Sequence, residues 1–167
     1  MKKITFITCG GTIDKDYATS KWSYDFMIGE PKVQDILDKL RLNMQIDIVS
    51  ILAKDSLDMN DEDRKIVLNA VKNSPSENII ITHGTDTMID TAKVLQSIPF
   101  KRIILVGSSL PYIFRNSDAD FNIWFAVGSV NTLSDIWKTW VYISMNGMLF
   151  DSTKVEKGED GVFRRVD

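Results

Sequence analysis

The segment Asn78–Met88, with the sequence NIIITHGTDTM, contains the pattern from which the fold can be predicted. Its first half, Asn78–Thr82, includes three consecutive isoleucines, and a short continuous apolar run is typical of a strand buried on both faces. The polar residues His83–Thr87 then form a turn, and Asp86–Ser97 has the spacing of a helix that Pro99 closes. A buried strand that leads through a polar turn into a helix is one unit of a parallel sheet.

The same strand–turn–helix unit recurs before and after this segment. Apolar runs predict strands and 3.6-residue spacing predicts helices, with short polar turns between them. The predicted strands are Lys3–Thr8, Gln45–Leu52, Arg102–Val106 and Trp140–Met145, and the predicted helices are Pro31–Leu42, a helix capped by Asn60, and Asp118–Leu133. We therefore predict an α/β fold with three layers, in which helices cover both faces of a mostly parallel twisted sheet, as in flavodoxin-like and Rossmann-like domains. Residues 1–167 are expected to form this single domain.

Two stretches lead to more local expectations. Residues Asp14–Gly29 show weak periodicity and mixed polarity, and the stretch is long for a strand-to-helix connection, so we expect a mobile or functional loop. In the last predicted helix, Phe121, Trp124 and Phe125 are expected to face inward.

Composition and charge narrow the class of protein. Hydrophobic residues make up 44% and charged residues 26% of the 167 residues, which is the balance of a globular domain. A net charge of −3 argues against a basic nucleic-acid-binding surface, and no apolar run approaches the roughly 20 residues needed to span a bilayer. Cys9 and His83 are the only residues of their types, which excludes an internal disulfide and multi-Cys or multi-His metal sites. We expect a cytoplasmic protein that binds neither nucleic acid nor membranes.

Hydroxyl and carboxylate side chains follow four of the predicted strands. Ligands of open α/β sheets bind beyond the carboxyl ends of the strands, so these turns should converge on one edge. The usual nucleophile patterns are missing: there is no Gly-x-Ser-x-Gly elbow, no Cys–His pair and no phosphate-binding loop. A hydroxyl nucleophile would need a lysine, aspartate or phenolate as its base. The four turns are Cys9–Thr12, Ala53–Asp58, His83–Thr87 and Gly107–Pro111.

These turns resemble the signatures of the bacterial-type L-asparaginase family. Thr82–Met88 matches the second family signature without a gap, and Thr8–Ile13 resembles the amino-terminal signature Thr-Gly-Gly-Thr-Ile. The further matches are Ser56–Asp61, Val106–Pro111 with Asp118–Asn122, and Met145–Gly147 with Lys157. The resemblance implies a short, single-domain member, because full-length relatives carry a second, carboxy-terminal domain that helps to close the site of a neighbouring subunit.

The resemblance also implies catalytic roles. Thr12 resembles the nucleophile that attacks the side-chain amide carbon of the substrate. Thr85, Asp86 and Lys157 resemble a second hydroxyl–carboxylate–amine set, in which a neutral Lys157 amine accepts a proton from Thr85. Lys154 is the competing lysine, but only Lys157 keeps the family spacing from Met145.

Further positions are implied to bind the substrate or to assist catalysis. Ser56 would donate to the α-carboxylate and Asp58 would pair with the α-amino group, while backbone N–H groups at Gly11, Thr12 and Thr85 would stabilise the oxyanion. A family tyrosine lies on the loop after the first threonine, and Tyr17 and Tyr24 both qualify. The expected substrate-binding residues are Gly11, Ser56, Asp58, Gly84 and Ser108.

Several of these residues also have plain structural interpretations. Asp86 is placed to cap the helix that begins there, in addition to any catalytic role. His83 is expected to make local hydrogen bonds and Cys9 to be a small core residue. Trp137 and Trp140 are expected to pack internally or to form a subunit interface.

Taken together, the resemblance implies an amidohydrolase that needs no metal or organic cofactor. It would hydrolyse L-asparagine, or L-glutamine, to the acid and ammonia through an acyl-threonine intermediate, as a homo-oligomer, expected to be a dimer. Two alternatives stay open. Hydroxyl-rich turns also cradle phosphates in flavodoxin-like mononucleotide-binding modules, although Asp58 and Asp86 would repel a phosphate. The chain could also be an asparaginase-like amino-acid binder with little or no turnover.

Overall fold

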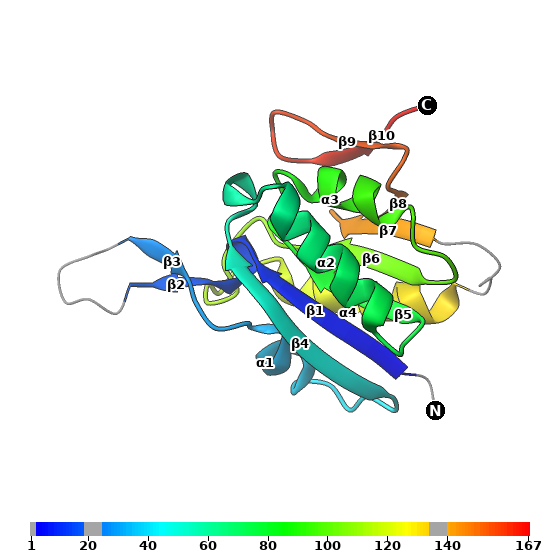
Figure 1. Cartoon of the computed structure of the whole chain (residues 1–167). Helices are drawn as coiled ribbons and strands as arrows, with labels where there is room; N and C mark the ends of the chain where they lie inside the picture. The colour runs from blue at the N-terminus through cyan, green and yellow to red at the C-terminus, as the bar shows by residue number, and fades with distance from the viewer. Residues whose placement is uncertain (1–2, 19–24, 134–139) are drawn as a thin grey trace.

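The computed structural model describes residues 3–18, 25–133 and 140–167. Within these ranges the main sheet has the strand order β4-β1-β5-β6-β7-β8 (Figure 1). The first five of these strands pair in parallel and β8 pairs antiparallel with β7 at the edge. This confirms the predicted mostly parallel α/β fold. The strands are β1 (Lys3–Gly10), β4 (Gln45–Lys54), β5 (Asn78–Thr82), β6 (Arg102–Val106), β7 (Trp140–Met145) and β8 (Met148–Asp151).

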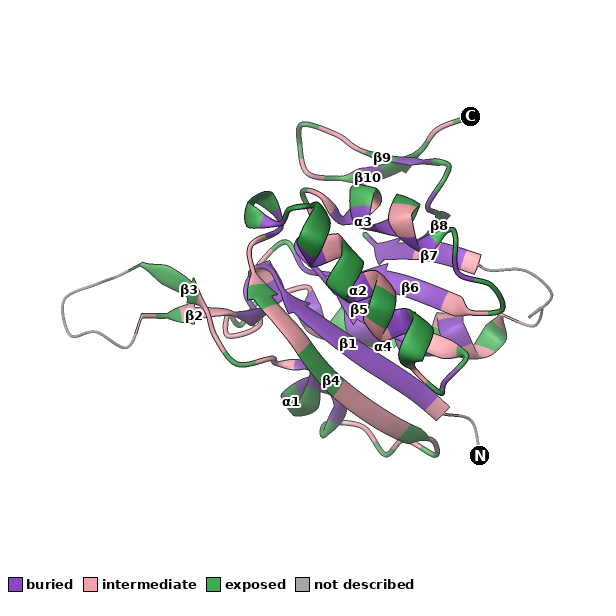
Figure 2. Ribbon diagram, viewed as in Figure 1, coloured by how far each residue is buried: buried purple, intermediate pink, exposed green. Residues whose placement is uncertain are grey.

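Helices cover both faces of the sheet. On one face, α2 (Asp61–Asn73) and α3 (Met88–Leu95) pack over a core that includes Ile79 and Ile81. On the other, α1 (Val33–Leu37) and α4 (Ala119–Thr132) pack over a core that includes Ile80. The three isoleucines of β5 are therefore buried alternately on opposite faces, and β1, β5 and β6 form the buried centre in Figure 2. In the described ranges no helix is both long and apolar enough to cross a membrane.

The stretch expected to be a loop contains a β-hairpin. Strands β2 (Lys15–Tyr17) and β3 (Phe26–Ile28) pair antiparallel and project from the body of the molecule (Figure 1). Residues 19–24, between Ala18 and Asp25, lie outside the described residues. Helix α1 is also shorter than the predicted Pro31–Leu42, because the residues after Leu37 form turns before β4 begins.

Two aromatic residues of α4 face outward, contrary to the sequence-based expectation. Phe121 is 55% and Trp124 is 38% exposed, while Asn122, Ile123 and Ala126 occupy the buried positions. The helix is apolar on both of its faces, so its periodicity indicates no unique inward side.

Short elements flank the sheet near the carboxyl ends of its strands. Two turns form 3-10 helices, η1 (Thr12–Asp14) after β1 and η2 (Ser56–Asp58) after β4. At the end of the chain, β9 (Val155–Lys157) and β10 (Phe163–Arg165) form a separate two-stranded ribbon near α3 (Figure 1).

Candidate active site

Three glycines bring the four polar turns into direct contact at one edge of the sheet. A Cβ atom added to Gly11 would lie 2.4 Å from the backbone nitrogen of Gly84, and one added to Gly84 would lie 2.6 Å from the Ser56 hydroxyl oxygen. A Cβ atom on Gly107 would lie 2.5 Å from the carbonyl oxygen of His83. The turn after β5 therefore touches the turns after β1, β4 and β6, at distances that only glycine allows.

Thr12 begins η1 directly after this close contact. Gly11 has a φ of 90°, in the left-handed region that favours glycine, and its N–H donates to the Lys54 carbonyl at 2.9 Å. Thr12 itself is half-buried, whereas Gly11 before it and Ile13 after it are buried. The backbone on both sides of Thr12 is thus held in place, next to the turn that carries Thr85.

Lys157 reaches this edge from the other end of the chain. Its Nζ lies 2.9 Å from Thr85 Oγ1 and 2.5 Å from Asp86 Oδ1. The Lys157 side chain is only 20% exposed, whereas Lys154 is exposed. The hydroxyl–carboxylate–amine set expected from the sequence is therefore in contact. The helix-cap interpretation of Asp86 is wrong, because α3 begins at Met88 with Thr87 as its N-cap and the Asp86 carboxylate accepts from Lys157 instead.

Ser56 and Asp58 occupy the turn that touches Gly84. Ser56 is buried, its hydroxyl oxygen accepts from the backbone N–H of Thr87 at 3.4 Å, and its carbonyl accepts from the Thr87 hydroxyl at 2.8 Å. Asp58, two residues on, is exposed. Ser56 therefore joins two turns of the site, and Asp58 presents its charge at the rim.

The turn after β6 is held by the side chains of Asp118, the N-cap of α4, and Asn122, within α4. The Asp118 carboxylate accepts from the backbone N–H of Ser109 at 2.9 Å and of Leu110 at 3.2 Å. The Asn122 amide donates to the Gly107 carbonyl at 3.0 Å. Ser108 is buried and its hydroxyl donates to the Leu110 carbonyl at 2.6 Å, so it is engaged within its own turn.

A family model for the amino-terminal part of asparaginases (Asparaginase, N-terminal) matches residues 3–163. The chain belongs to the asparaginase family. A glutaminase-asparaginase of Acinetobacter glutaminasificans is 29% identical over 168 residues, and L-asparaginase 2 of Escherichia coli (strain K12) is 28% identical over 169 residues. These matches cover 93% and 94% of this chain but 49% and 47% of the two relatives, so the chain spans about half of their length.

A solved structure supports the same assignment. The thermostable L-asparaginase from Thermococcus kodakarensis superposes with a TM-score of 0.81 at 25% identity, over 98% of this chain and 51% of that chain. The resemblance inferred from the turn motifs and the predicted fold class are both confirmed by these matches.

His83 and Cys9 have structural roles in this member of the asparaginase family. His83 is buried, and burial lowers its pKa to about 4, so its ring is neutral. Since the Gly84 carbonyl can only accept, Nδ1 carries the proton at 2.8 Å and Nε2 accepts from the Thr91 hydroxyl at 2.8 Å. Burial also raises the pKa of the Cys9 thiol to about 12, as expected of an inert core cysteine.

Of the two candidate tyrosines, only Tyr17 lies within the described residues. Tyr17 lies on β2, is 57% exposed and packs against Phe26, with 5.0 Å between the ring centres. Tyr24 lies outside the described residues, as does Trp137. Trp140 is half-buried and stacks on Tyr142, with 5.9 Å between the ring centres, which is a packing contact within the chain.

Sequence reasoning missed Asp14, a buried carboxylate at the root of the hairpin. Its Oδ1 accepts from the Lys32 backbone N–H at 2.9 Å, and its carbonyl accepts from the Gly29 N–H at 2.8 Å. Its Oδ2 is buried and has no hydrogen-bond partner among the described residues. Burial raises the pKa of the Asp14 carboxyl to about 6. An acidic residue followed by the charged Lys15 and Asp16 gives no sign of burial in a sequence.

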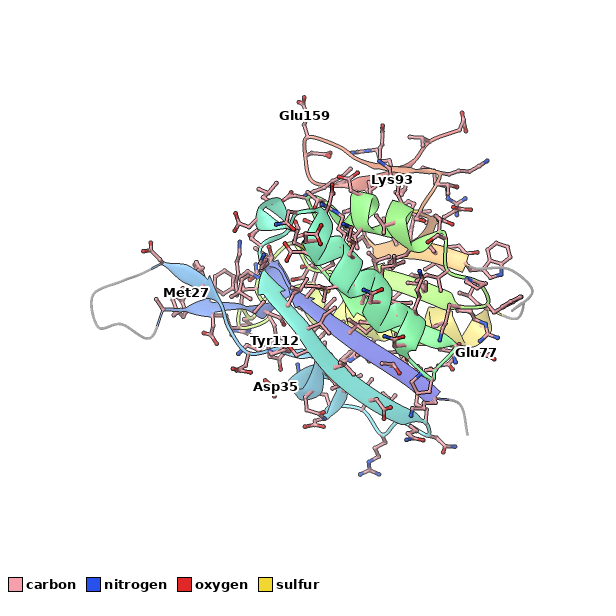
Figure 3. All side chains as sticks on the ribbon, in the orientation of Figure 1. Met27, Asp35, Glu77, Lys93, Tyr112 and Glu159 are labelled. Carbon is pink, nitrogen blue, oxygen red and sulfur yellow. The ribbon has the colours of Figure 1, made fainter. Side chains whose placement is uncertain are left out.

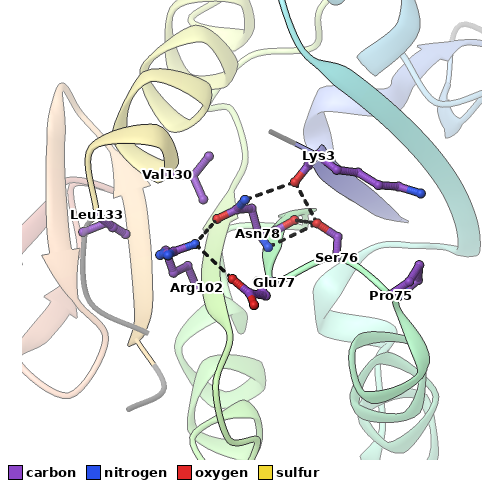
Figure 4. Close-up of a pocket in the computed structure, with 8 residues that line it drawn as sticks. All are labelled: Lys3, Pro75, Ser76, Glu77, Asn78, Arg102, Val130 and Leu133. Atoms are coloured by element: carbon purple, nitrogen blue, oxygen red, sulfur yellow. Dashed lines mark hydrogen bonds and ion pairs between the residues drawn. The ribbon is translucent and has the colours of Figure 1, made fainter. Parts of the chain in front are cut away.

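A hollow of about 380 Å³ lies at the other end of the strands, where β1, β5 and β6 begin (Figure 4). Several of its polar groups pair with one another: Arg102 donates to the Asn78 amide oxygen at 2.6 Å, and Ser76 donates to the Lys3 carbonyl at 2.8 Å. Figure 3 shows the separation: Glu77 of this hollow lies at the lower right, and Glu159 of the loop after Lys157 lies at the top. This hollow therefore lies away from the four turns that carry the candidate site.

Proposed function

We propose that this chain is an amidohydrolase of the L-asparaginase type, which converts L-asparagine to L-aspartate and ammonia. The contact of the Lys157 amine with Thr85 and Asp86 carries this proposal, since it unites residues that are 72 and 71 positions apart. Family membership supports the reaction class. One relative is named a glutaminase-asparaginase, which makes L-glutamine the second substrate to test.

Thr12 is the proposed nucleophile. Its hydroxyl oxygen adds to the carbon of the substrate side-chain amide, and the resulting oxyanion accepts hydrogen bonds from backbone N–H groups at Gly11, Thr12 and Thr85. Breakage of the C–N bond releases ammonia, which takes up the hydroxyl proton, and leaves an ester on Thr12. Water then hydrolyses this ester to the free acid and restores the hydroxyl.

Thr85 and Lys157 are the proposed proton-transfer pair. Lys157 Nζ donates to Thr85 Oγ1 at 2.9 Å, so an amine that has given up a proton is within reach of the proton of the Thr85 hydroxyl. The Thr85 oxygen then takes up a proton from the attacking hydroxyl or water, and the Lys157 ammonium gives its proton to the leaving nitrogen in the first half-reaction and to the Thr12 oxygen in the second. Asp86 holds the amine in place at 2.5 Å and is the second partner for the substrate ammonium.

Substrate binding is proposed for the turns around this pair. Ser56 donates to the α-carboxylate, and Asp58 pairs with the α-amino group from the rim. Gly11 and Gly84 allow the substrate to approach the backbone, and Ser108 contributes to the wall beside the leaving amide. Tyr17, on β2, or Tyr24, outside the described residues, is proposed as the tyrosine that assists catalysis.

Assembly and location are proposed together with the activity. We propose a cytoplasmic homodimer, on the basis of the family resemblance. The substrate is a small amino-acid amide, and no metal or organic cofactor takes part in the steps above.

Ammonia release from L- and D-asparagine, L-glutamine and related amides tests the proposal. Thr12→Ala and Thr85→Val are each expected to abolish release while circular dichroism shows an intact fold. Thr132→Ala, at the exposed end of α4, is the matched control. Undiminished turnover in both variants would contradict the assignment. Tight binding of L-asparagine without ammonia release would instead identify an amino-acid binder.

A further inference from the structure

The ribbon β9–β10 carries Lys157 but is separate from the main sheet. Two buried side chains anchor it: Val155 from β9 and Phe163 from β10 both belong to the core beneath α2 and α3. Apolar burial holds a segment in place without specifying direction. The amine of Lys157 nevertheless meets two oxygens at hydrogen-bond distance, so a directional contact is needed to set the position of the ribbon.

One such directional contact comes from Asn146. Its side-chain oxygen accepts from the backbone N–H of Phe163 at 2.8 Å. Phe163 lies directly opposite Lys157 in the antiparallel pair. Because Gly158 donates to Val162 at 2.9 Å, the next pair, Lys157 and Phe163, is the one without mutual backbone hydrogen bonds. The N–H of Phe163 therefore points away from β9 and donates to the side-chain oxygen of Asn146.

Asn146 lies in the turn that joins two strands of the main sheet. It follows the buried Met145 at the end of β7 and has a φ of 52°, and Gly147 has a φ of 74°. Two central residues with positive φ form the tight turn that joins β7 to β8, and asparagine is one of the few residues that adopts this conformation readily. This turn therefore places the side-chain oxygen of Asn146 next to the ribbon.

We propose that Asn146 is the positioning residue for Lys157, which it places against Thr85 and Asp86 through its hydrogen bond to Phe163. This inference rests on the proposed function, because only in that reaction does the position of the Lys157 amine determine a rate. Proton transfer and attack require the reacting groups to be aligned to well under an ångström, so a small shift of the ribbon slows catalysis before it affects the fold.

Two substitutions separate the hydrogen bond from the turn. Asn146→Gly retains the left-handed backbone and removes the acceptor, whereas Asn146→Asp retains both the acceptor and a residue tolerated in the turn. We expect Asn146→Gly to lower kcat for L-asparagine by about 10- to 100-fold with KM changed less than about twofold. Asn146→Asp is expected to retain most of the wild-type kcat. Equal losses in both variants, or wild-type kcat in Asn146→Gly, would overturn the proposal.

A readout without turnover separates this inference from the proposed function. An amine-reactive acetylating reagent modifies both Lys157 and exposed Lys154, and mass spectrometry gives the ratio of the Lys157 rate to the Lys154 rate. This ratio reports how well the contacts with Thr85 and Asp86 protect the Lys157 amine. We expect Asn146→Gly to raise this ratio at least about threefold and Asn146→Asp to leave it near the wild-type value. If wild-type protein releases no ammonia and the ratio still changes in this way, the positioning role stands and the proposed function fails. An unchanged ratio in Asn146→Gly refutes the positioning role.

Discussion

Ionisation of the buried Asp14 carboxyl should lower the free energy of unfolding as pH rises from 4 to above 6, whereas buried His83, whose pKa is lowered to about 4, changes it in the opposite direction over the same range. The pKa of the Asp14 carboxyl is raised from 3.8 to about 6 by burial. Each pKa unit corresponds to about 1.4 kcal/mol, so ionised Asp14 lowers the free energy of unfolding by about 3 kcal/mol compared with an unperturbed carboxyl. The native protein holds the proton more tightly than the unfolded chain. The stabilisation is therefore complete below about pH 4 and is lost as pH rises through about 6.

The variant Asp14→Asn isolates this effect. The neutral amide still accepts from Lys32 through its oxygen, and it places an NH₂ group where Oδ2 lies unpartnered among the described residues. An unsatisfied buried donor costs about 1–3 kcal/mol at every pH. The difference in unfolding free energy, variant minus wild type, should therefore rise by about 3 kcal/mol between pH 4 and pH 8, whatever its starting value.

Urea denaturation followed by circular dichroism, at intervals between pH 4 and pH 8, measures this difference. Asp61→Asn is the control, because the side chain of Asp61 is 95% exposed. Its difference from wild type is expected to stay nearly constant over the same range. A flat profile for Asp14→Asn would show that Asp14 titrates like an exposed carboxyl, and the argument from its burial would then be wrong.

Three further outcomes are expected from the geometry of the site. Lys157→Met should lower kcat for L-asparagine by about 10²–10⁴-fold, the usual effect of removing a proton-transfer group, whereas Lys154→Met should leave it unchanged. Gly84→Ala should destabilise the fold by about 1–3 kcal/mol in urea denaturation, because its methyl group would lie 2.6 Å from a buried serine hydroxyl. Thr91→Val should cost about 1–3 kcal/mol in the same assay, because it leaves Nε2 of buried His83 without its donor.

The sequence predicts the parts of the fold that repeat a simple pattern. The isoleucines of β5 form a continuous apolar run because they are buried alternately on the two faces, and such a run followed by a polar turn indicates a parallel strand. The convergence of the turns follows from the parallel sheet alone. The outward side of α4 could not be predicted, because Phe121 and Trp124 make that face as apolar as the inner one.

The burial of single polar groups is harder to predict from a sequence. Asp14 resembles any acidic residue of a loop, and its burial depends on Lys32 and Gly29, which approach from beyond the hairpin. Asp86 precedes a helix, as a capping residue would, but the approach of Lys157 from the ribbon decides where its carboxylate points. Both outcomes depend on contacts between segments far apart in sequence, which local patterns do not encode.

The proposed site therefore has two kinds of support with different physical origins. Thr12, Ser56 and Thr85 lie on turns whose spacing is fixed by backbone contacts at glycine, within the cooperative core of the sheet. Lys157 comes from an appended ribbon that two apolar side chains and the Asn146 contact hold in place. Segments with few anchors open at lower free energy than the core around them. The amine is thus the member of the site whose position is least determined by the fold, and a change that loosens the ribbon should affect catalysis while the four turns remain together.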